Sequence, residues 1–525
     1  MGDRYNQLLD SLHSGRIGRR EFLASASALG LAAGLPKAAR AQPKQGGRLR
    51  IGMGHGSTTD TLDPAAFENG YMLQLTYTIH NYLTEVDNFG KLAPELAASW
   101  EPSPDAVEWT FVLKDGLTFH NGKTVTAGDV IASFNHHRGE ESKSAAKPIV
   151  DPIKDITAID ERTVRFVLDG GNADFPFIVS DYHLPILPAK DDGKLDLSGV
   201  GCGPYVLDNW EPGVRGLFRK FADYHKTDRA HFDEIELLSI IDVTARTNAL
   251  TTGEIDVMDR CDLKTVHLLG RNPNIKVQET TGTRHYTFPM RTDMAPHDDA
   301  NVRRALKWGV DREKLVQTVL RGHGVVGNDH PIAPSMRYHA ADLEQTSYDP
   351  DKAKFYLKEA GLSNLTVDLS AADAAFAGAV DAATLYREHA AAAGIEINIV
   401  REPNDGYWSN VWMKKPWCAC YWGGRPTEDW MFSTAYQSGV AWNDTYWSNE
   451  RFDTLLLEAR SELDESRRGD MYREMQSILR DDGGLVCAMF ANYVFAHSDK
   501  VAHDDQMGGN WDLDGQKCIE RWWFA

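Results

Sequence analysis

The stretch 108–130 reads EWTFVLKDGLTFHNGKTVTAGDV, and its pattern changes from that of a strand to that of a helix. Large apolar side chains occupy every second position from Trp109 to Leu113, which indicates a half-buried strand. The Lys-Asp-Gly sequence at 114–116 is typical of a turn. Thr126, with an acid three residues later, predicts the start of a helix. The stretch therefore predicts a strand, a turn, a second strand and a helix.

Comparable signals on both sides of this stretch extend the mixed pattern along the chain. The clearest begins at Asp349, which can cap a helix whose first turn accommodates Pro350 and which Gly361 can end. We therefore expect α/β architecture with several sheets. The expected strands lie near 47–53, 255–257, 417–422 and 485–490, and the expected helices near 242–250, 311–322, 349–361, 450–463 and 466–479.

Length and composition limit the class of protein. A chain of 525 residues is too long for a single core, so two or three packed units are expected. The hydrophobic fraction of 42% is typical of a soluble globular protein, and no run approaches the roughly 18 apolar residues of a membrane-spanning helix. A formal net charge of −20 repels phosphate backbones and anionic lipid. Nucleic acid is therefore not expected as a partner.

The N-terminus has the features of an export signal. Residues 18–23 read GRREFL, and a mildly apolar stretch follows at 23–35. The Ala-Arg-Ala sequence at 39–41 matches a small-x-small cleavage site. The alternative is an amphipathic first helix, but Ala, Ser and Gly dominate the stretch and give it no polar face. We therefore predict a twin-arginine signal peptide over 1–41 and, because no cysteine follows the cleavage site, a freely diffusing periplasmic protein.

Six cysteines are too few to build a disulfide scaffold in a chain of this length. Cys418 and Cys420 invite a metal interpretation, but their two-residue spacing is not that of a zinc knuckle, and the segment 417–422 alternates like a strand. Buried small side chains are the preferred interpretation. The sequence is also compatible with one or two disulfides, whose pairing it does not fix. The six cysteines are Cys202, Cys261, Cys418, Cys420, Cys487 and Cys518.

Several short motifs follow one another in the order seen in a known family. They are KLAPELAASWE at 91–101, WTF at 109–111, KDG at 114–116, FHNG at 119–122, TAGDV at 126–130, GCGPY at 201–205, WEPG at 210–213, GEID at 253–256, NVRRAL at 301–306, DRE at 311–313 and YDPDKA at 348–353. In this order the chain resembles the large peptide-, dipeptide- and nickel-type solute-binding proteins of ABC importers, called family 5. Most of these motifs form turns and helix starts, so their roles are structural.

The resemblance implies the α/β, two-lobed periplasmic binding protein fold of the large, three-domain type, with mixed sheets and a ligand cleft between the lobes. A ligand in such a cleft stabilises closure by contacting both lobes, and the membrane permease would recognise the closed state. By analogy, domain I comprises 46–88, 199–282 and 490–525, domain II comprises 89–198, and domain III comprises 283–489, with the C-terminal tail packed back on the first lobe.

Tryptophans are concentrated between positions 408 and 447, where seven of the 14 in the chain occur. Such density suggests a stacking wall for an apolar, ring-bearing or cationic group of a ligand. The alternative is that they pack the core of domain III. The candidates for ligand contact are Trp408, Trp422, Trp430 and Trp442.

The loop after the strand at 417–422 departs from the pattern of its relatives. Peptide-binding relatives carry an aspartate there that meets the ligand's amino terminus, whereas this chain has Arg425. A guanidinium favours a carboxylate or another anion, and Glu428 or Asp429 could still serve an amine. Arg291, where relatives often have asparagine, is a second candidate anion contact. The alternative for Arg425 is an ion pair with a neighbouring acid.

These features predict the periplasmic substrate-binding component of an ABC importer. Its solute would be a peptide or an amino-acid derivative, with a carboxylate as the favoured feature, and its partners the permease and, through it, the ATPase subunits. We expect a monomer. We also expect no catalytic residues, cofactor or metal, because we find no nucleophile elbow, phosphate-binding glycine loop or HExxH motif. The alternatives are an exported periplasmic enzyme, a binding protein for a nickel chelate or a sugar, and a chaperone or chemosensory receptor.

Overall fold

The computed structural model describes residues 43–67, 69–404 and 406–525 of the chain. The predicted signal peptide over 1–41 lies outside these residues. Residues 45–524 form a single unit that contains all of the helices and strands below. None of the described helices is long and apolar enough to span a membrane.

A nine-stranded sheet draws its strands from most of the chain, in the order β16-β12-β17-β11-β1-β10-β9-β8, with β13 paired to β17. It is mixed, as predicted, because β1 runs parallel to β10 and β11 whereas the other pairs are antiparallel. Its strands are β1 (Arg48–Met53), β8 (Tyr205–Glu211), β9 (Arg215–Lys220), β10 (Glu234–Ser239), β11 (Val257–Met258), β12 (Ile275–Pro289), β13 (Gly324–Val326), β16 (Cys420–Trp422) and β17 (Leu485–Ser498).

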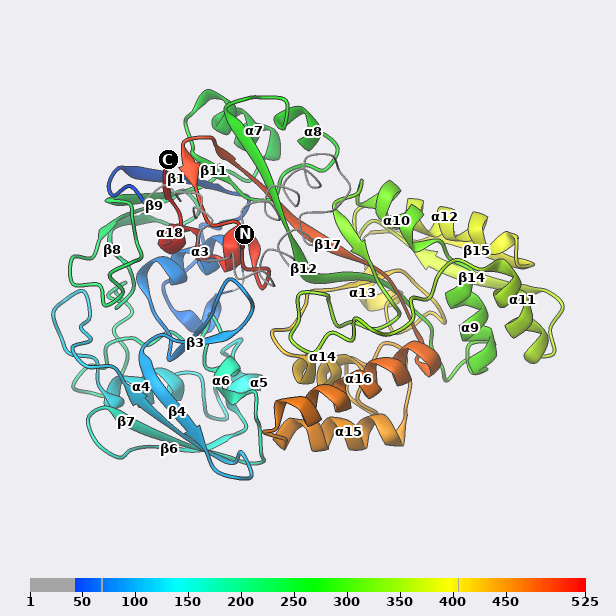
Figure 1. The fold of residues 1–525 in the computed structure, drawn as a ribbon, viewed down its shortest axis with the longest axis horizontal. Helices are drawn as coiled ribbons and strands as arrows, with labels where there is room; N and C mark the ends of the chain where they lie inside the picture. Colours follow the sequence, from blue (N-terminus) through cyan, green and yellow to red (C-terminus); the bar gives the residue numbers. More distant parts are fainter. Residues whose placement is uncertain (1–42, 68, 405) are drawn as a thin grey trace, which may run out of the picture. The chain divides into compact units, whose positions relative to one another are not determined.

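The two longest strands of this sheet, β12 and β17, lie side by side (Figure 1). Their register runs from Ile275 opposite Ser498 to Pro289 opposite Leu485, with two irregularities, one between Thr281 and His285 and one between Tyr286 and Thr287. The strand predicted near 485–490 therefore continues to Ser498, because its second half pairs with the first half of β12.

A separate four-stranded antiparallel sheet contains the opening stretch of sequence, in the order β4 (Ala97–Pro102), β5 (Glu108–Leu113), β7 (Thr163–Leu168) and β6 (Ile153–Ala158). The predicted alternation in β5 is confirmed, since Trp109, Phe111 and Leu113 are all buried. The predicted helix is α4 (Ala127–Asn135), where Asp129 accepts a hydrogen bond from the backbone N of Thr126 at 2.9 Å.

One prediction for this stretch is wrong. The expected second strand between the turn and the helix is only an isolated bridge between Thr118 and Thr124. The segment folds back on itself, because Val125 N donates to Leu117 O at 3.0 Å and Phe119 N donates to Lys123 O at 2.8 Å. Its two arms therefore pair with each other and do not join the four-stranded sheet.

A two-stranded parallel sheet is formed by β14 (Leu365–Ala371) and β15 (Ile395–Arg401). Four helices share its hydrophobic core: α9 (Ala300–Trp308), α10 (Arg312–Val319), α11 (Pro350–Glu359) and α12 (Ala379–Ala391). The predicted start and end of α11 are confirmed, because Asp349 accepts from the backbone N of Lys352 at 2.9 Å and Gly361 adopts φ 75°.

The remaining elements include the other predicted helices, at α7, α15 and α16. The helices are η2 (Pro64–Ala66), α3 (Gly70–Ile79), α5 (Lys147–Val150), α6 (Phe175–Ile178), α7 (Val243–Thr252), α8 (Val266–Leu269), α13 (Tyr407–Asn410), α14 (Glu428–Ala435), α15 (Glu450–Ser461), α16 (Glu465–Asp482), α17 (Asp512–Gly515) and α18 (Cys518–Arg521). The short strands are β2 (Thr84–Val86), β3 (Leu92–Pro94), β18 (Val501–Ala502) and β19 (Trp523–Phe524).

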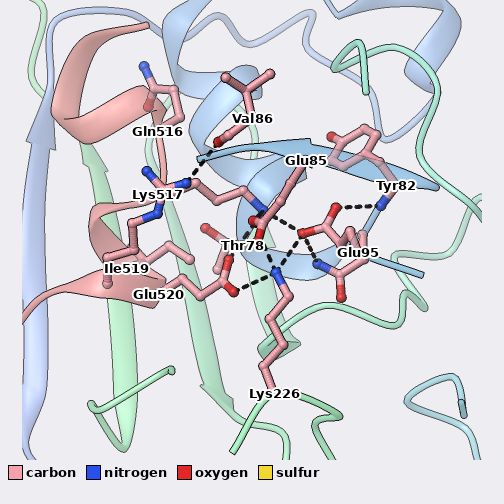
Figure 2. Close-up of polar contacts among 12 residues, drawn as sticks. Thr78, Tyr82, Glu85, Val86, Glu95, Lys226, Gln516, Lys517, Ile519 and Glu520 are labelled. Atoms are coloured by element: carbon pink, nitrogen blue, oxygen red, sulfur yellow. Dashed lines mark hydrogen bonds and ion pairs between the residues drawn. The ribbon is translucent and has the colours of Figure 1, made fainter. Parts of the chain in front are cut away.

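A buried network of charges holds the C-terminal segment against the N-terminal part of the chain. Lys226 Nζ lies 3.1 Å from Glu85, 2.9 Å from Glu95 and 2.9 Å from Glu520. Lys517 Nζ lies 2.7 Å from Glu95 and 3.2 Å from Glu520. Figure 2 shows both ammonium groups among the carboxylates. The C-terminal tail therefore packs back on the first part of the chain, as predicted.

The three carboxylates of this network have the spacing of metal ligands, but each of them already forms ion pairs with the two lysines. Burial alone would raise the pKa of Glu85, and Lys226 and Lys517 lower it to about 2. A carboxyl group whose pKa is lowered in the folded state stabilises that state above its ordinary pKa of 4.5. The contribution of Glu85 is lost as the pH falls from 4.5 toward 2. The cluster is a structural ion network.

Lys226→Met should lower the free energy of unfolding by about 3–5 kcal/mol, because it leaves buried carboxylates without one of their two cations. Urea denaturation at pH 7 measures the loss. Lys194→Met is the matched control, since the Lys194 side chain is 82% exposed and its ion pair with Asp192 is long, at 3.8 Å. Equal stability of the two variants would contradict the structural role of the network.

Candidate functional site

A cavity of about 550 Å³ lies among the described residues and is lined by segments that are distant in sequence. Its volume is in the range of small-molecule sites, roughly 300–1,000 Å³. All three predicted domains contribute to its wall. The lining residues come from 77–90, 174–181, 279–283, 334–337, 424–428 and 505–517.

Nine charged side chains line this cavity, and most have partners in the protein. Lys517 belongs to the buried ion network, and Arg337 pairs with Glu465 and lies over the ring of Tyr338 at 4.8 Å. Asp181 and Glu279 each bind a histidine. The acidic residues are Glu85, Asp174, Asp181, Glu279, Glu428 and Asp505, and the basic residues are Arg337, Arg425 and Lys517.

Arg425 differs from the other two basic residues of the cavity. Its guanidinium donates to the carbonyl oxygens of Gly423 at 2.9 Å and Gly424 at 3.3 Å. Within the described part of the chain, no carboxylate lies at ion-pair distance from it, so the predicted alternative of a neighbouring acid is not seen. Burial lowers the pKa of Arg425, but a guanidinium stays protonated at neutral pH. Its charge is available to an anion in the cavity.

The position of Arg425 follows from the loop that carries it. This loop joins β16 to α14, and Thr427 caps the helix by accepting from the backbone N of Trp430 at 3.3 Å. Gly424 packs so closely on β12 that a Cβ there would lie 1.8 Å from Thr283 Oγ1 and 2.9 Å from the Thr283 carbonyl carbon. The absence of a side chain at Gly424 therefore lets the loop bring Arg425 to the cavity.

Glu428 and Asp429, the two predicted amine contacts, have different surroundings. Glu428 lines the cavity, is 3% exposed, and accepts from the backbone N of Tyr338 at 2.8 Å. Burial raises its pKa to about 7. Asp429 is absent from the lining and binds Arg460 Nε at 3.0 Å. Burial raises the pKa of Asp429 to about 6. The structure thus brings Arg425 and Glu428, but not Asp429, to the cavity.

The four candidate tryptophans lie outside the lining of this cavity. Trp422 is buried, and its Nε1 donates to Asp444 at 3.2 Å, while Trp412 Nε1 donates to the same oxygen at 3.0 Å. Trp408 and Trp442, 40% and 51% exposed, extend the cluster through ring contacts to Trp412 and Trp422. These tryptophan rings therefore contact one another in the folded protein, and their role in ligand contact stays a prediction. Trp430 is half-buried on α14.

Arg291 also lies outside the lining. Its guanidinium binds Asp293, with Nη2 2.6 Å from Oδ2, and stacks over the ring of Tyr446 at 4.0 Å from the centroid. It is therefore already paired with an acid, in contrast to Arg425.

Several lining residues carry no signal in the sequence. Asp174 precedes the four-residue helix α6, and Lys517 and Trp511 belong to the C-terminal segment, where no motif suggested a site. Their places depend on pairings such as Arg468 with Asp174, which join segments almost 300 residues apart. Only the prediction that the C-terminal tail packs back on the first lobe pointed toward this region.

All six cysteines are buried and free in the described structure, so no disulfide joins them. Cys418 and Cys420 follow the predicted strand pattern, with Cys420 in β16 and Cys418 in an isolated bridge to Ser370. Burial raises the pKa of both thiols. The interpretation of Cys418 and Cys420 as buried small side chains is confirmed.

The chain matches the model of one protein family. The chain matches bacterial extracellular solute-binding proteins, family 5 Middle, over residues 91–444, which is more than half of its length. It belongs to that family, whose members are substrate-binding proteins with the two-lobed periplasmic binding protein fold.

Individual relatives agree with this assignment. The dipeptide-binding protein of Escherichia coli strain K12 is 26% identical over 449 residues, which cover 78% of this chain and 81% of that protein. The structure of HbpA2 from Haemophilus parasuis shares the fold with a TM-score of 0.80 at 20% identity, covering 89% of this chain and 99% of that one. The PBP AgaA from A. tumefaciens R10, in complex with agropinic acid, has a TM-score of 0.71 at 25% identity, covering 91% and 99%.

Gly424→Ala should destabilise the protein by about 1–3 kcal/mol, because the new Cβ overlaps both the side chain and the backbone of Thr283. Urea denaturation at pH 7 measures the effect. Gly423→Ala is the matched control one residue earlier, where an added Cβ meets no atom within 4 Å. A Gly424→Ala variant as stable as Gly423→Ala would show that the loop has room to move away from β12.

Proposed function

We propose that this protein is the periplasmic substrate-binding component of an ABC importer. It captures a peptide or an amino-acid-derived solute that carries a carboxylate, and delivers it to the membrane permease and, through the permease, to the ATPase subunits. The observation that carries the proposal is Arg425, a guanidinium without a carboxylate partner in the described structure, on the wall of a ligand-sized cavity.

Arg425 suits a carboxylate for chemical reasons. A guanidinium presents planar N–H donors that match the two oxygens of a carboxylate, and hydrogen bonds between charged groups are about twice as strong as neutral ones. Arg425 Nη1 already donates hydrogen bonds to the backbone carbonyl oxygens of Gly423 and Gly424, and these bonds hold the side chain in place. The anion therefore meets a group whose orientation is set before binding.

The cavity wall also fits a receptor that closes around its ligand. Predicted domains I, II and III all contribute lining residues, so a bound solute contacts both proposed lobes. The strands β12 and β17 pass between predicted domains I and III, and the register irregularity between Thr281 and His285 falls at the predicted boundary near 282. We place the hinge in this part of the two strands.

The relatives support the solute class. Relatives of this chain include dipeptide-binding and glutathione-binding proteins, and the AgaA structure holds agropinic acid. Relatives with other solutes are a heme-binding protein of Haemophilus influenzae and NikZ from Campylobacter jejuni in complex with Ni(L-His). Among the alternatives, no residue of the described structure favours an enzyme or a sugar-binding protein over this proposal.

Arg425→Ala should weaken the binding of a carboxylate-bearing ligand at least tenfold, because a hydrogen bond to a charged group contributes about 1.5–3 kcal/mol. A melting-temperature screen of di- and tripeptides and amino-acid derivatives first finds the ligand, and calorimetry then measures its affinity. Arg291→Ala is the matched control and should bind as the natural chain does, since Arg291 lies outside the cavity. Unchanged affinity in Arg425→Ala would exclude the carboxylate contact.

Export by the twin-arginine route is part of the proposal. Replacing Arg19 and Arg20 by lysine should leave the protein in the cytoplasmic fraction, because the paired arginines are the recognised feature of such signals. Immunoblots of periplasmic and cytoplasmic fractions report the outcome. Periplasmic protein at the natural level in the double variant would exclude this route.

A further inference from the structure

The hairpin that joins β2 to β3 places an exposed aromatic ring on the cavity wall. Phe89, in the turn at 87–91, lines the cavity and is 66% exposed, more than any other large apolar side chain of the described residues. A single exposed ring is common on protein surfaces and has no meaning by itself. Phe89 differs from such a ring in two respects, which are its place in a ligand-sized cavity and the contacts that fix its backbone.

The turn that carries Phe89 is held by hydrogen bonds. Asp87 Oδ1 accepts from the backbone N of Phe89 at 2.8 Å. Asn88 and Gln506 exchange two further bonds, because Asn88 Nδ2 donates to the carbonyl oxygen of Gln506 and Gln506 Nε2 donates to the carbonyl oxygen of Asn88, both at 3.0 Å. These bonds join segments that are 418 residues apart. The ring is therefore presented to the cavity by a turn of fixed position.

The contacts of this turn also bring it next to two methionines of the cavity wall. Gln506, which binds the turn, is followed in the chain by Met507. On the other side of the ring, Gly90 lies close to Ser335, since a Cβ at Gly90 would be 3.6 Å from the Ser335 carbonyl oxygen. Ser335 is followed by Met336. Both methionines line the cavity and are half-buried. The turn thus has an apolar neighbour in the wall on each side.

We infer that Phe89, Met336 and Met507 form a subsite for an apolar side chain of the ligand, and that Phe89 determines this specificity. The inference rests on the proposed function. It narrows the solute to a peptide or an amino-acid derivative that carries an apolar side chain together with its carboxylate.

The chemistry of the three side chains suits an apolar group. They carry no charge, and a ligand group that covers them removes apolar surface from water on both partners. A polar group would lose its hydrogen bonds to water there and find no replacement on these side chains. Methionine side chains are unbranched and adapt to different shapes, so the subsite should accept leucine, methionine and phenylalanine side chains.

The position of the subsite links apolar contact to closure of the protein. Phe89 belongs to predicted domain II, Met336 to predicted domain III and Met507 to the C-terminal part of predicted domain I. An apolar side chain held among them contacts both proposed lobes. Its burial therefore favours the closed state over the open one.

The test compares leucine with asparagine, which has nearly the same shape and a polar end. The probes are alanylleucine, alanylasparagine, leucylalanine and asparaginylalanine. Calorimetry with the mature protein should show, at one of the two positions, that the leucine compound binds about tenfold tighter or better than its asparagine counterpart. Phe89→Ala should reduce this preference about fivefold, whereas Phe89→Leu should retain most of it.

Phe355→Ala is the matched control and should keep the preference, because Phe355 is 54% exposed and lies outside the cavity lining. Both rings are largely exposed, so neither alanine variant should change the urea midpoint of unfolding. A loss of preference in Phe89→Ala alone therefore reports ligand contact and not folding.

Each result decides between the subsite and the proposed function. Equal affinity for the leucine and asparagine compounds at both positions would overturn the subsite and leave the carboxylate contact of Arg425 standing. An unchanged preference in Phe89→Ala would overturn the role of Phe89, and reduced uptake by cells in that case would indicate that the ring contacts the permease. Failure of all four probes to bind would overturn the subsite, while the Arg425→Ala comparison on the screened ligand decides the proposed function separately.

Discussion

The pairing of β12 with β17 is the constraint on which most of this structure depends. The two strands are about 200 residues apart in sequence and are paired from Ile275 to Pro289, so the nine-stranded sheet forms only when these distant segments meet. β11, β13 and β16 attach to them. The end of β16 leads directly into the loop of Arg425. The position of Arg425 in the cavity wall therefore depends on the register of these strands. Burial of side chains on the strands favours a single register.

Burial of charge serves two different purposes in this protein. Around Lys226 and Lys517, each carboxylate has an ammonium within about 3 Å, so the cost of desolvation is offset inside the protein. In the cavity, the guanidinium of Arg425 lacks an acid within the described structure. Paired buried charges stabilise the fold, whereas a charge without a partner favours a ligand of the opposite sign.

The tryptophan cluster shows why residue density is a weak guide to a site. Counting along the sequence correctly indicated that these rings gather. It could not indicate that Trp412 and Trp422 turn their indole nitrogens toward the buried Asp444, or that the cavity wall would carry Trp511 instead. Which face of a strand or helix meets a cavity depends on the elements packed beside it. That information is absent from a single segment.

The sequence by itself determined the local structure and the family. Alternation in β5, the caps Thr126 and Asp349, and the ordered motifs act within a few residues, so their outcome is largely independent of the rest of the chain. It also singled out Arg425 and Glu428. Only the tertiary structure decided that Asp429 binds Arg460, that Arg291 binds Asp293, and that Asp174 and Lys517 line the cavity. These outcomes depend on contacts between distant segments, whose geometry exists only once the sheets have assembled.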